Sequence, residues 1–154
     1  MDLIDRKIIA ALQRDATLSI AQIADMVGLS QTPCWKRIQK LDQSGVIKSR
    51  VAIIDPRAIG LGLTVFVSVT TDDHSPEWRD RFAVSVGGMP EVLDLYRMAG
   101  EVDYMLRVVV ADMATYDSFY KRLTTAIPLK TVTSRFAMEA VKSTTAYPIN
   151  IGPA

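Results

Sequence analysis

Basic side chains gather in one short part of this chain, between residues 30 and 50. Asp42 is the single acid in that stretch, although the 154-residue chain as a whole has a formal net charge of only +1. A local cationic surface on a nearly neutral chain matches the phosphates of a nucleic acid better than a general need for solubility. Gln31 and Thr32, which precede the basic residues, have side chains suited to hydrogen bonds with base edges. The basic residues are Lys36, Arg37, Lys40, Lys48 and Arg50.

Two short helices joined by a turn would hold these side chains. Apolar residues at positions 20, 23, 24 and 27 follow the helical period and share one face of the first helix. Ser19 and Gln22 have the spacing of a capping box at its start, and Gly28 fits a left-handed C-cap at its end. Ser30 then caps a second helix, whose first turn tolerates Pro33.

The second helix divides into an inward and an outward side. Cys34, Ile38 and Leu41 form the inward stripe, which leaves the basic and polar residues on the other side. This pattern indicates a helix-turn-helix whose second helix enters the DNA major groove, although an ordinary pair of packed helices has a similar pattern. In a DNA complex we expect Lys36 and Arg37 to contact phosphates.

Nine residues are candidates for contact with DNA. The sequence leaves two alternatives open for Trp35, which either stacks on the sugar-phosphate backbone or packs against the first helix. Cys34 lies on the inward stripe, so we expect a buried, inert thiol and not a redox sensor. The candidates are Ser30, Gln31, Thr32, Trp35, Lys36, Arg37, Lys40, Lys48 and Arg50.

The composition argues against several other classes of protein. Apolar residues make up 49% of the chain, enough for a packed core, yet no run is long and apolar enough to span a membrane. The N-terminus lacks the residue order of a secretory signal, and one cysteine suits a reducing compartment, so we expect a cytoplasmic protein. His74 with Asp72 and Asp73 lacks the spacing of a metal site, and no nucleophile or cofactor motif is present. We therefore expect no catalytic residues, no metal, no cofactor and no enzyme.

Residues 1–55 are expected to form the N-terminal domain. The β-branched stretch 46–54 predicts a short hairpin or wing that carries Lys48 and Arg50. Proline and glycines then indicate a linker over residues 56–62. An amphipathic helix opens the domain, with Asp2 as its cap and with Leu3, Ile4, Ile8, Ala11 and Leu12 on its apolar side.

Residues 63–154 are expected to form a second domain, because the apolar period changes after the linker. Its elements follow the order βαββαβ, which predicts a ferredoxin-like antiparallel sheet with helices on one face. The other face needs a cover, and a second subunit is the simplest one. Tyr116, Phe119 and Tyr120 are expected in the core. The strands are 63–71, 92–98, 104–110 and 132–141, and the helices are 77–86 and 113–126.

Six segments occur along the chain in the order of a known family. They are Asp2–Arg6, Val27–Ser30, Thr32–Ile38, Gly45–Ile47, Gly100–Tyr104 and Met138–Lys142. These segments resemble the Lrp/AsnC family, the feast/famine transcription regulators of bacteria and archaea, over essentially the whole chain. The resemblance implies an α+β fold, with an N-terminal winged helix-turn-helix followed by a ferredoxin-like βαββαβ domain of RAM or ACT-like type. The fifth segment looks like the family's G-D-x-D-[YF] turn, and the sixth matches its last sheet strand.

The resemblance also implies partners. Family members regulate amino-acid metabolism as homodimers that assemble further, so we expect a tetramer or octamer that binds a pseudo-palindromic site in double-stranded DNA. Their effectors, usually amino acids, bind near the turn, and cysteine is one candidate here. Glu101 and Asp103 suit an ammonium group, and the amides of residues 99–102 suit a carboxylate. The expected effector-binding residues are Met98, Ala99, Gly100, Glu101, Val102, Asp103, Tyr104, Thr133 and Ser134.

Two departures from the family pattern bear on the effector site. Glu101 stands where the family usually has aspartate, so its carboxylate reaches further. The segment 127–130 lacks the usual glycine after its proline and is one residue short, which leaves the contacts of Thr133 and Ser134 open. An alternative function also stays open, namely an ACT-like small-molecule-binding or enzyme-associated regulatory protein that uses its N-terminal helices for docking and not for DNA.

Overall fold

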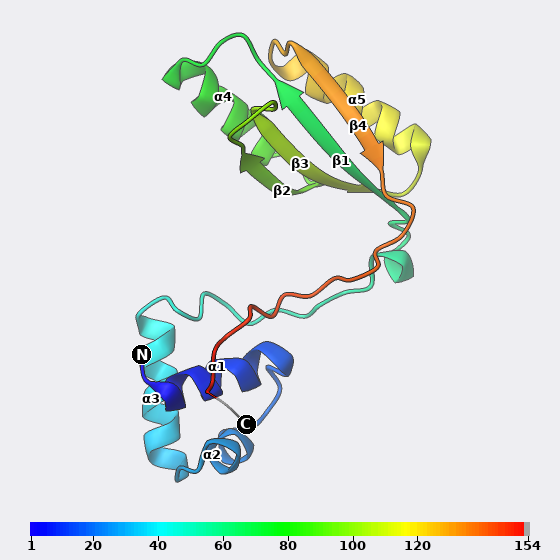
Figure 1. Ribbon diagram of the computed structural model, residues 1–154. Coiled ribbons are helices and arrows are strands. Elements are labelled where there is room, and N and C mark those ends of the chain that lie inside the picture. Colours follow the sequence, from blue (N-terminus) through cyan, green and yellow to red (C-terminus); the bar gives the residue numbers. More distant parts are fainter. Residues whose placement is uncertain (153–154) are drawn as a thin grey trace. The chain divides into compact units, whose positions relative to one another are not determined.

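The computed structural model describes residues 1–152, which fold into two compact units (Figure 1). One unit contains residues 1–53 together with the tail that begins at Lys142. The other contains Ile54–Val141, and therefore the whole sheet. The tail was expected to belong to the second domain, so this grouping differs from the expected division of the chain. Among the described residues, no helix combines the length and the apolar character needed to cross a membrane.

The first two helices begin and end at the residues that their caps indicate. Helix α1, Leu3–Arg14, starts with a capping box between Asp2 and Asp5. Helix α2, Ile20–Val27, starts with a second box in which the Ser19 hydroxyl accepts the Gln22 N–H. Gly28 ends α2 with a φ of 72°, a left-handed conformation that a glycine adopts without steric cost. The predicted turn of the helix-turn-helix is therefore confirmed.

Helix α3, Gln31–Gln43, completes the core of this unit. Its inward stripe is buried as predicted, and Cys34 is 0% exposed. Burial raises the pKa of the Cys34 thiol, because the thiolate would lose its hydration. A buried thiol with a raised pKa is unreactive, which agrees with the expectation of an inert cysteine. The buried core residues are Ile8, Ile23, Ala24, Cys34, Ile38 and Leu41.

The predicted wing was wrong. No strand lies between α3 and the sheet in the described chain, and residues 46–55 form no regular element. The stretch 46–54 contains β-branched residues but no Gly, Asn or Asp within it to reverse the chain, and a two-stranded hairpin needs such a turn. A short 3-10 helix, Pro56–Ile59, follows and ends at Gly60, so the expected linker is partly ordered.

The C-terminal tail lies against α1. The side-chain amide of Gln13 accepts the Tyr147 N–H at 2.7 Å and donates to the Tyr147 carbonyl at 3.2 Å. Arg6 donates to the Asn150 carbonyl at 3.3 Å. Since one side chain pairs with both polar groups of one backbone residue, the tail is fixed in register along α1. Nothing in the sequence pattern indicated this contact.

The second unit is a four-stranded antiparallel sheet in the order β2-β3-β1-β4, with the two middle strands β1 and β3 in register from Leu63↔Val110 to Val69↔Tyr104. This order confirms the predicted ferredoxin-like topology. The strands are β1 Leu63–Thr70, β2 Val92–Arg97, β3 Tyr104–Val110 and β4 Thr131–Phe136. Strand β4 ends earlier than predicted, so Met138–Lys142, which the family resemblance placed in the last strand, lies beyond the sheet.

Two helices cover one face of this sheet, as predicted (Figure 1). Helix α4, Pro76–Gly87, contributes the buried Trp78 and Phe82, whose rings stack with centroids 4.9 Å apart. Helix α5, Met113–Ala126, contributes Tyr116, Phe119 and Leu123. The period-2 alternation of β1 and β3 supplies the facing layer of the core, in which Val65, Val67, Val69, Leu106 and Val108 are 0% exposed.

Candidate nucleic-acid interface and effector turn

The exposed side of α3 carries uncharged polar and basic side chains. Gln31 and Thr32 lie in the first turn, and Lys36, Gln39 and Lys40 follow on the side opposite the buried stripe. Within residues 1–152, neither lysine forms an ion pair, so their ammonium groups are available to an external anion. This is the side that the sequence predicted to face DNA.

The start of α3 differs from the prediction in one detail. Ser30 occupies the N-cap position with extended backbone angles, as expected, but its hydroxyl makes no capping hydrogen bond. The amides of the first helical turn therefore lack an internal side-chain acceptor from this residue. A helix N-terminus with free N–H groups attracts anions, and phosphate is one of them.

Arg37 has a different environment from the one expected. Its Nη1 lies 2.7 Å from Asp2 Oδ2 and 2.7 Å from Asp5 Oδ1, and its side chain is only 32% exposed. Arg37 thus connects α3 to the capping box of α1 instead of pointing toward solvent with Lys36. The sequence prediction grouped Arg37 with the phosphate-binding residues because it is basic. The acidic residues near the start of α1 were the signal that it has internal partners.

The charges in this cluster reinforce each other. The pKa of Asp2 is lowered, first because its carboxylate accepts the Asp5 N–H and then because it accepts a hydrogen bond from Arg37. The carboxylates of Asp2 and Asp5 in turn raise the pKa of Arg37 by accepting its hydrogen bonds. Solvent still reaches the cluster, since the side chain of Asp2 is 54% exposed, so its main effect is to fix the α1–α3 geometry and not to add much stability.

The two basic residues after α3 have unequal surroundings. Arg50 Nη2 contacts Asp42 at 3.1 Å, which neutralises the single acid of this stretch. Lys48 is exposed and has no ion pair among the described residues. An Arg50 that pairs with Asp42 contributes less free positive charge than the sequence implied.

The turn between β2 and β3 presents four free backbone donors. The N–H groups of residues 99–102 donate no hydrogen bond within residues 1–152. Gly100 has a φ of +125°, which a side chain-bearing residue rarely adopts. The Met98 N–H donates to the Asp103 carbonyl at 2.8 Å, and the Asp103 N–H donates to the Val69 carbonyl at 3.0 Å. These bonds close the base of the turn and leave its tip open, as an anion-binding turn requires.

The two carboxylates near this turn are not equivalent. Asp103 Oδ2 accepts the Thr71 N–H at 2.8 Å, and Asp103 Oδ1 lies 3.7 Å from His74 Nδ1. Glu101 is exposed and has no hydrogen-bond partner among the described residues. Asp103 therefore holds the loop after β1 in place, and Glu101 is the freer acceptor for an ammonium group.

Two of the expected effector-binding residues point elsewhere. Tyr104 is 7% exposed, and its ring packs on Phe82 with centroids 4.4 Å apart, so it belongs to the core. Ser134 hydrogen-bonds the Tyr116 hydroxyl on the helix-covered face of the sheet. Thr133 directly precedes Ser134 in β4 and so faces the opposite side. Since neighbouring strand residues alternate, Thr133 and Ser134 cannot line one site together.

The loop at residues 127–130 is well anchored. Ile127 is buried, and the Trp78 indole N–H donates to the Pro128 carbonyl at 3.2 Å. Lys130 extends its N–H to the Thr70 carbonyl at 2.9 Å and its ammonium to Asp72 at 2.6 Å. The missing glycine therefore does not leave this loop without fixed contacts.

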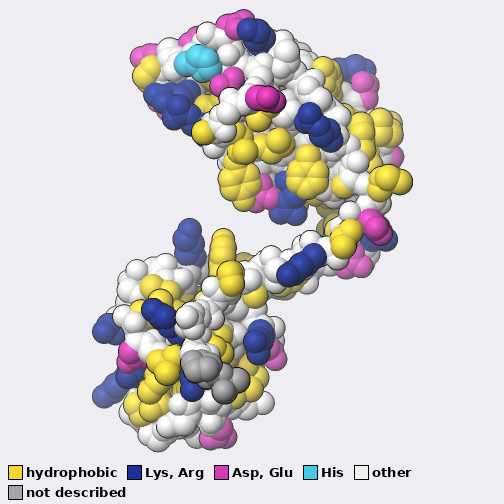
Figure 2. All heavy atoms as spheres, viewed as in Figure 1, with side chains coloured by type: hydrophobic (Ala, Val, Ile, Leu, Met, Phe, Trp, Pro, Cys, Tyr) yellow, Lys and Arg dark blue, Asp and Glu magenta, His cyan; other side chains and the backbone are white. Residues whose placement is uncertain are grey.

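The sheet face opposite α4 and α5 carries large exposed apolar side chains. Phe66 is 41% exposed and Tyr96 is 59% exposed, and the register places Tyr96 beside Met105. Around them lie the ion pair between Arg107 and Asp94 and a hydrogen bond from Arg135 to Ser68. In Figure 2, yellow side chains gather on the surface of the sheet unit with basic and acidic side chains beside them.

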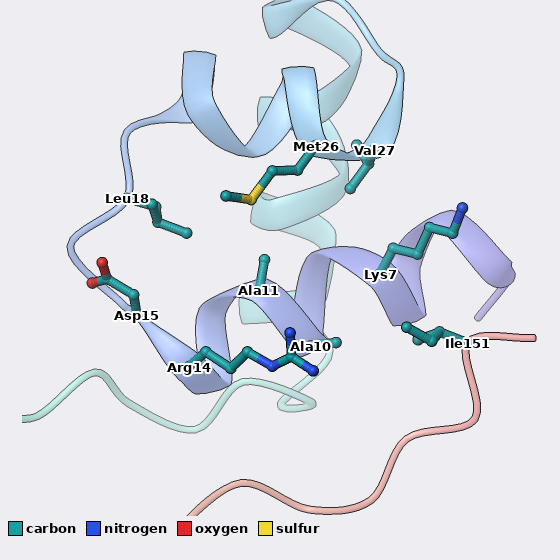
Figure 3. Close-up of a pocket in the computed structure, with 9 residues that line it drawn as sticks. All are labelled: Lys7, Ala10, Ala11, Arg14, Asp15, Leu18, Met26, Val27 and Ile151. Carbon is teal, nitrogen blue, oxygen red and sulfur yellow. The ribbon is translucent and has the colours of Figure 1, made fainter. Parts of the chain in front are cut away.

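A hollow of about 420 Å³ lies in the other unit, between α1 and α2 (Figure 3). Met26 and Leu18 extend over Ala11, and Arg14 and Lys7 border the hollow. Ile151 of the tail closes one side. None of the expected effector-binding residues contributes to it. No group of three or more His, Cys, Asp or Glu side chains converges as a metal site in the described chain.

Together, these features define a two-part protein in which a helix-turn-helix unit is joined to a ferredoxin-like unit with a turn of free donors. A model of the AsnC-type helix-turn-helix domain matches residues 1–42, and a model of the Lrp/AsnC ligand binding domain matches residues 64–147. The chain belongs to the Lrp/AsnC family. It is a DNA-binding transcription regulator with a ligand-binding domain, as the sequence resemblance predicted.

Known proteins resemble the chain over nearly its full length. The DNA-binding transcriptional activator DecR of Escherichia coli K12 is 55% identical, with 97% of this chain and 99% of the relative covered. The glutamate uptake regulatory protein of Zymomonas mobilis is 44% identical, with 97% and 91% covered. An AsnC family transcriptional regulator from Agrobacterium tumefaciens has a similar structure, with a TM-score of 0.93, 54% identity, and 96% and 97% covered. The Neisseria meningitidis regulator NMB0573, solved as an L-Met complex, has a TM-score of 0.92 and 31% identity, with 97% of each chain covered.

Proposed function

We propose that α3 is the recognition helix and that its exposed side enters the major groove of DNA. The observation that carries this proposal is the division of α3 into a buried apolar stripe and an exposed side whose lysines form no ion pair with any described residue. Lys36 and Lys40 contact phosphates, and Gln31 and Thr32 reach base edges. Arg37 is left out of the phosphate contacts, because its two aspartates already satisfy it. The other proposed contacts are Ser30, Trp35, Lys48 and Arg50.

We further propose that two copies pair through the open sheet faces. Exposed Phe66 and Tyr96 support this, because such a patch on a sheet is stable when another surface covers it. A twofold dimer presents two α3 helices to successive major grooves of a pseudo-palindromic site. Such dimers assemble further into tetramers or octamers in the cytoplasm. Changing Tyr96 to Glu places a charge in the pairing face, so sedimentation should show smaller species than the wild type forms.

The turn at residues 98–103 is our proposed site for an amino-acid effector. Its free N–H groups bind the effector carboxylate, and Glu101, with Asp103 beside it, accepts the ammonium. Two relatives favour an amino acid, since one is named for glutamate uptake and another was solved as an L-Met complex. The genes controlled are then those of amino-acid metabolism, and cysteine remains a candidate effector alongside these two.

Salt-dependent binding tests the DNA proposal. A duplex is first selected by the wild-type protein from a random-sequence pool, and its affinity is then measured by fluorescence anisotropy across salt concentrations. Replacing Lys36 or Lys40 with Ala should lower the magnitude of the slope of log K against log salt by about 1 each. Lys121→Ala on α5 is the control with the same charge change, and its slope should equal that of the wild type. Failure of the wild-type protein to retain any duplex contradicts the proposal.

A thermal-shift screen of the twenty amino acids tests the effector proposal, because a ligand of the folded state raises its apparent stability. Gly100→Arg fills the open turn and should abolish the shift while DNA binding persists. Gly60→Arg is the matched control, since Gly60 also has a positive φ of 80° and open space around it but lies outside the turn. An unchanged response in Gly100→Arg places the effector elsewhere.

A further inference from the structure

The two tryptophans of this chain have opposite surroundings. Trp78 is 1% exposed, and its indole N–H donates to the Pro128 carbonyl. Trp35 on α3 is 43% exposed. Within residues 1–152, its indole N–H has no hydrogen-bond partner. One exposed aromatic is ordinary on a protein surface, so its position on the helix decides what it means.

Trp35 lies beside the residues that face DNA in our proposal. Thr32 and Gln39 are three positions before it and four positions after it, so both are its neighbours on the helix surface. Lys36 follows it directly and is exposed. The indole is therefore a large apolar surface with one free donor at the edge of a polar, cationic helix face. It has not packed into the core of its unit, although Cys34 next to it is fully buried.

Two interactions of Trp35 are therefore unsatisfied in the free protein: the exposed part of the ring lacks apolar contact, and the indole N–H lacks an acceptor among the described residues. The major groove offers both close together, because thymine presents a C5-methyl group there and phosphate oxygens border the groove. We propose that Trp35 reads sequence, with its ring against a thymine methyl group and its indole N–H donating to a phosphate oxygen. This inference rests on the proposed role of α3 as the recognition helix.

Fluorescence quenching distinguishes Trp35 from Trp78, because the two side chains differ in exposure. In the free protein, acrylamide should quench the exposed Trp35 and leave the buried Trp78 largely protected. Addition of the pool-selected duplex should protect the quenchable fraction. In Trp35→Phe, which retains Trp78 alone, the same duplex should change quenching very little. A Trp35 that stays equally quenchable in the DNA complex overturns the inference.

Substitutions on both partners test the two contacts. Trp35→Phe keeps a ring but removes the donor, so it should weaken binding about tenfold and leave the salt slope unchanged, because no charge is lost. Deoxyuridine in place of the contacted thymine removes one methyl group and should weaken the wild-type complex about fourfold. Trp35→Ala should no longer distinguish thymine from deoxyuridine. Circular dichroism of each variant confirms that it is folded.

The outcomes separate this inference from the proposed function. If the wild type binds no duplex, the role of α3 fails and the inference falls with it. If Lys36→Ala flattens the salt slope but Trp35→Ala keeps full affinity, α3 is upheld and the Trp35 contact alone is overturned. Equal sensitivity of Trp35→Ala and wild type to deoxyuridine likewise refutes the thymine contact, because another residue must then touch that methyl group.

Discussion

Gly28, at the corner of the helix-turn-helix, allows a stability change to be worked out in advance. Its φ is 72°, and a Cβ added there would meet no atom within 4 Å. Replacing Gly28 with Ala therefore causes no clash, and its cost is backbone strain alone. That strain is about 1–2 kcal/mol for a residue with a side chain. The smaller freedom of Ala in the unfolded chain offsets about 0.5 kcal/mol of it. We expect a net loss of about 1 kcal/mol.

Hydrogen exchange is the suitable assay, because a chain of two units need not unfold in one step. Amides of α1 to α3 should exchange about fivefold faster in Gly28→Ala, the factor that corresponds to about 1 kcal/mol. Gly87→Ala is the matched control. Gly87 lies at the end of α4 without a positive φ and with open space, so this variant should be as stable as the wild type or slightly more stable.

Two results would refute this reasoning. If Gly28→Ala exchanges at the wild-type rate, the left-handed conformation does not determine the cost of a side chain there. If the loss exceeds about 3 kcal/mol, the Cβ must meet atoms that the open space excludes, since strain alone does not reach that value. A similar loss in Gly87→Ala would show that the effect comes from removing any glycine and not from its φ.

Three further changes test other contacts. The pKa of Asp2 is lowered, so the stability that its carboxylate contributes is present above the ordinary pKa of 3.8 and is lost as the pH falls through the lowered pKa. Hydrogen exchange of α1 measured between about pH 5 and 2 should therefore depend less on acid in Asp2→Asn than in the wild type. Equal acid dependence in the two proteins contradicts this. Phe119→Ala leaves a cavity at a fully buried position and should lower the free energy of unfolding of the sheet unit in urea by about 3–5 kcal/mol. Val84→Ala, at a 77% exposed position, should lower it by less than about 0.5 kcal/mol. Gln13→Ala removes both bonds to the Tyr147 backbone, so the Tyr147 amide should exchange about fivefold faster, and an unchanged rate would show that the tail is held by other contacts.

Local signals predicted the elements well, because they act over a few residues. The spacing of Ser19 and Gln22 and the position of Gly28 located α2 at both ends. The change of apolar period after the linker predicted the strands, and the order of elements predicted the sheet topology. Each of these signals is a property of one helix or strand, and each is visible in one stretch of sequence.

Contacts between distant segments were the part that the sequence did not predict. Arg37 resembled Lys36 as a basic residue of α3, but the partner that distinguishes it is 35 residues away at Asp2. Tyr104 belonged to a recognisable turn motif, yet its direction depends on strand pairing, which turns it toward Phe82. The direction of a strand residue is fixed by register, and register is a property of the assembled sheet.

The hydrogen bonds between α1 and the C-terminal tail have a consequence for folding during translation. Helix α1 leaves the ribosome early, but Gln13 contacts a residue 134 positions later in the chain, and Arg6 contacts one 144 positions later. Contacts of such sequence separation form late and slowly. During synthesis, the three-helix core has time to form while the side of α1 that binds the tail stays exposed. That side is covered only after the sheet unit and the tail have been translated. The nascent helix-turn-helix therefore spends most of translation without its last contacts, as a candidate client for chaperones.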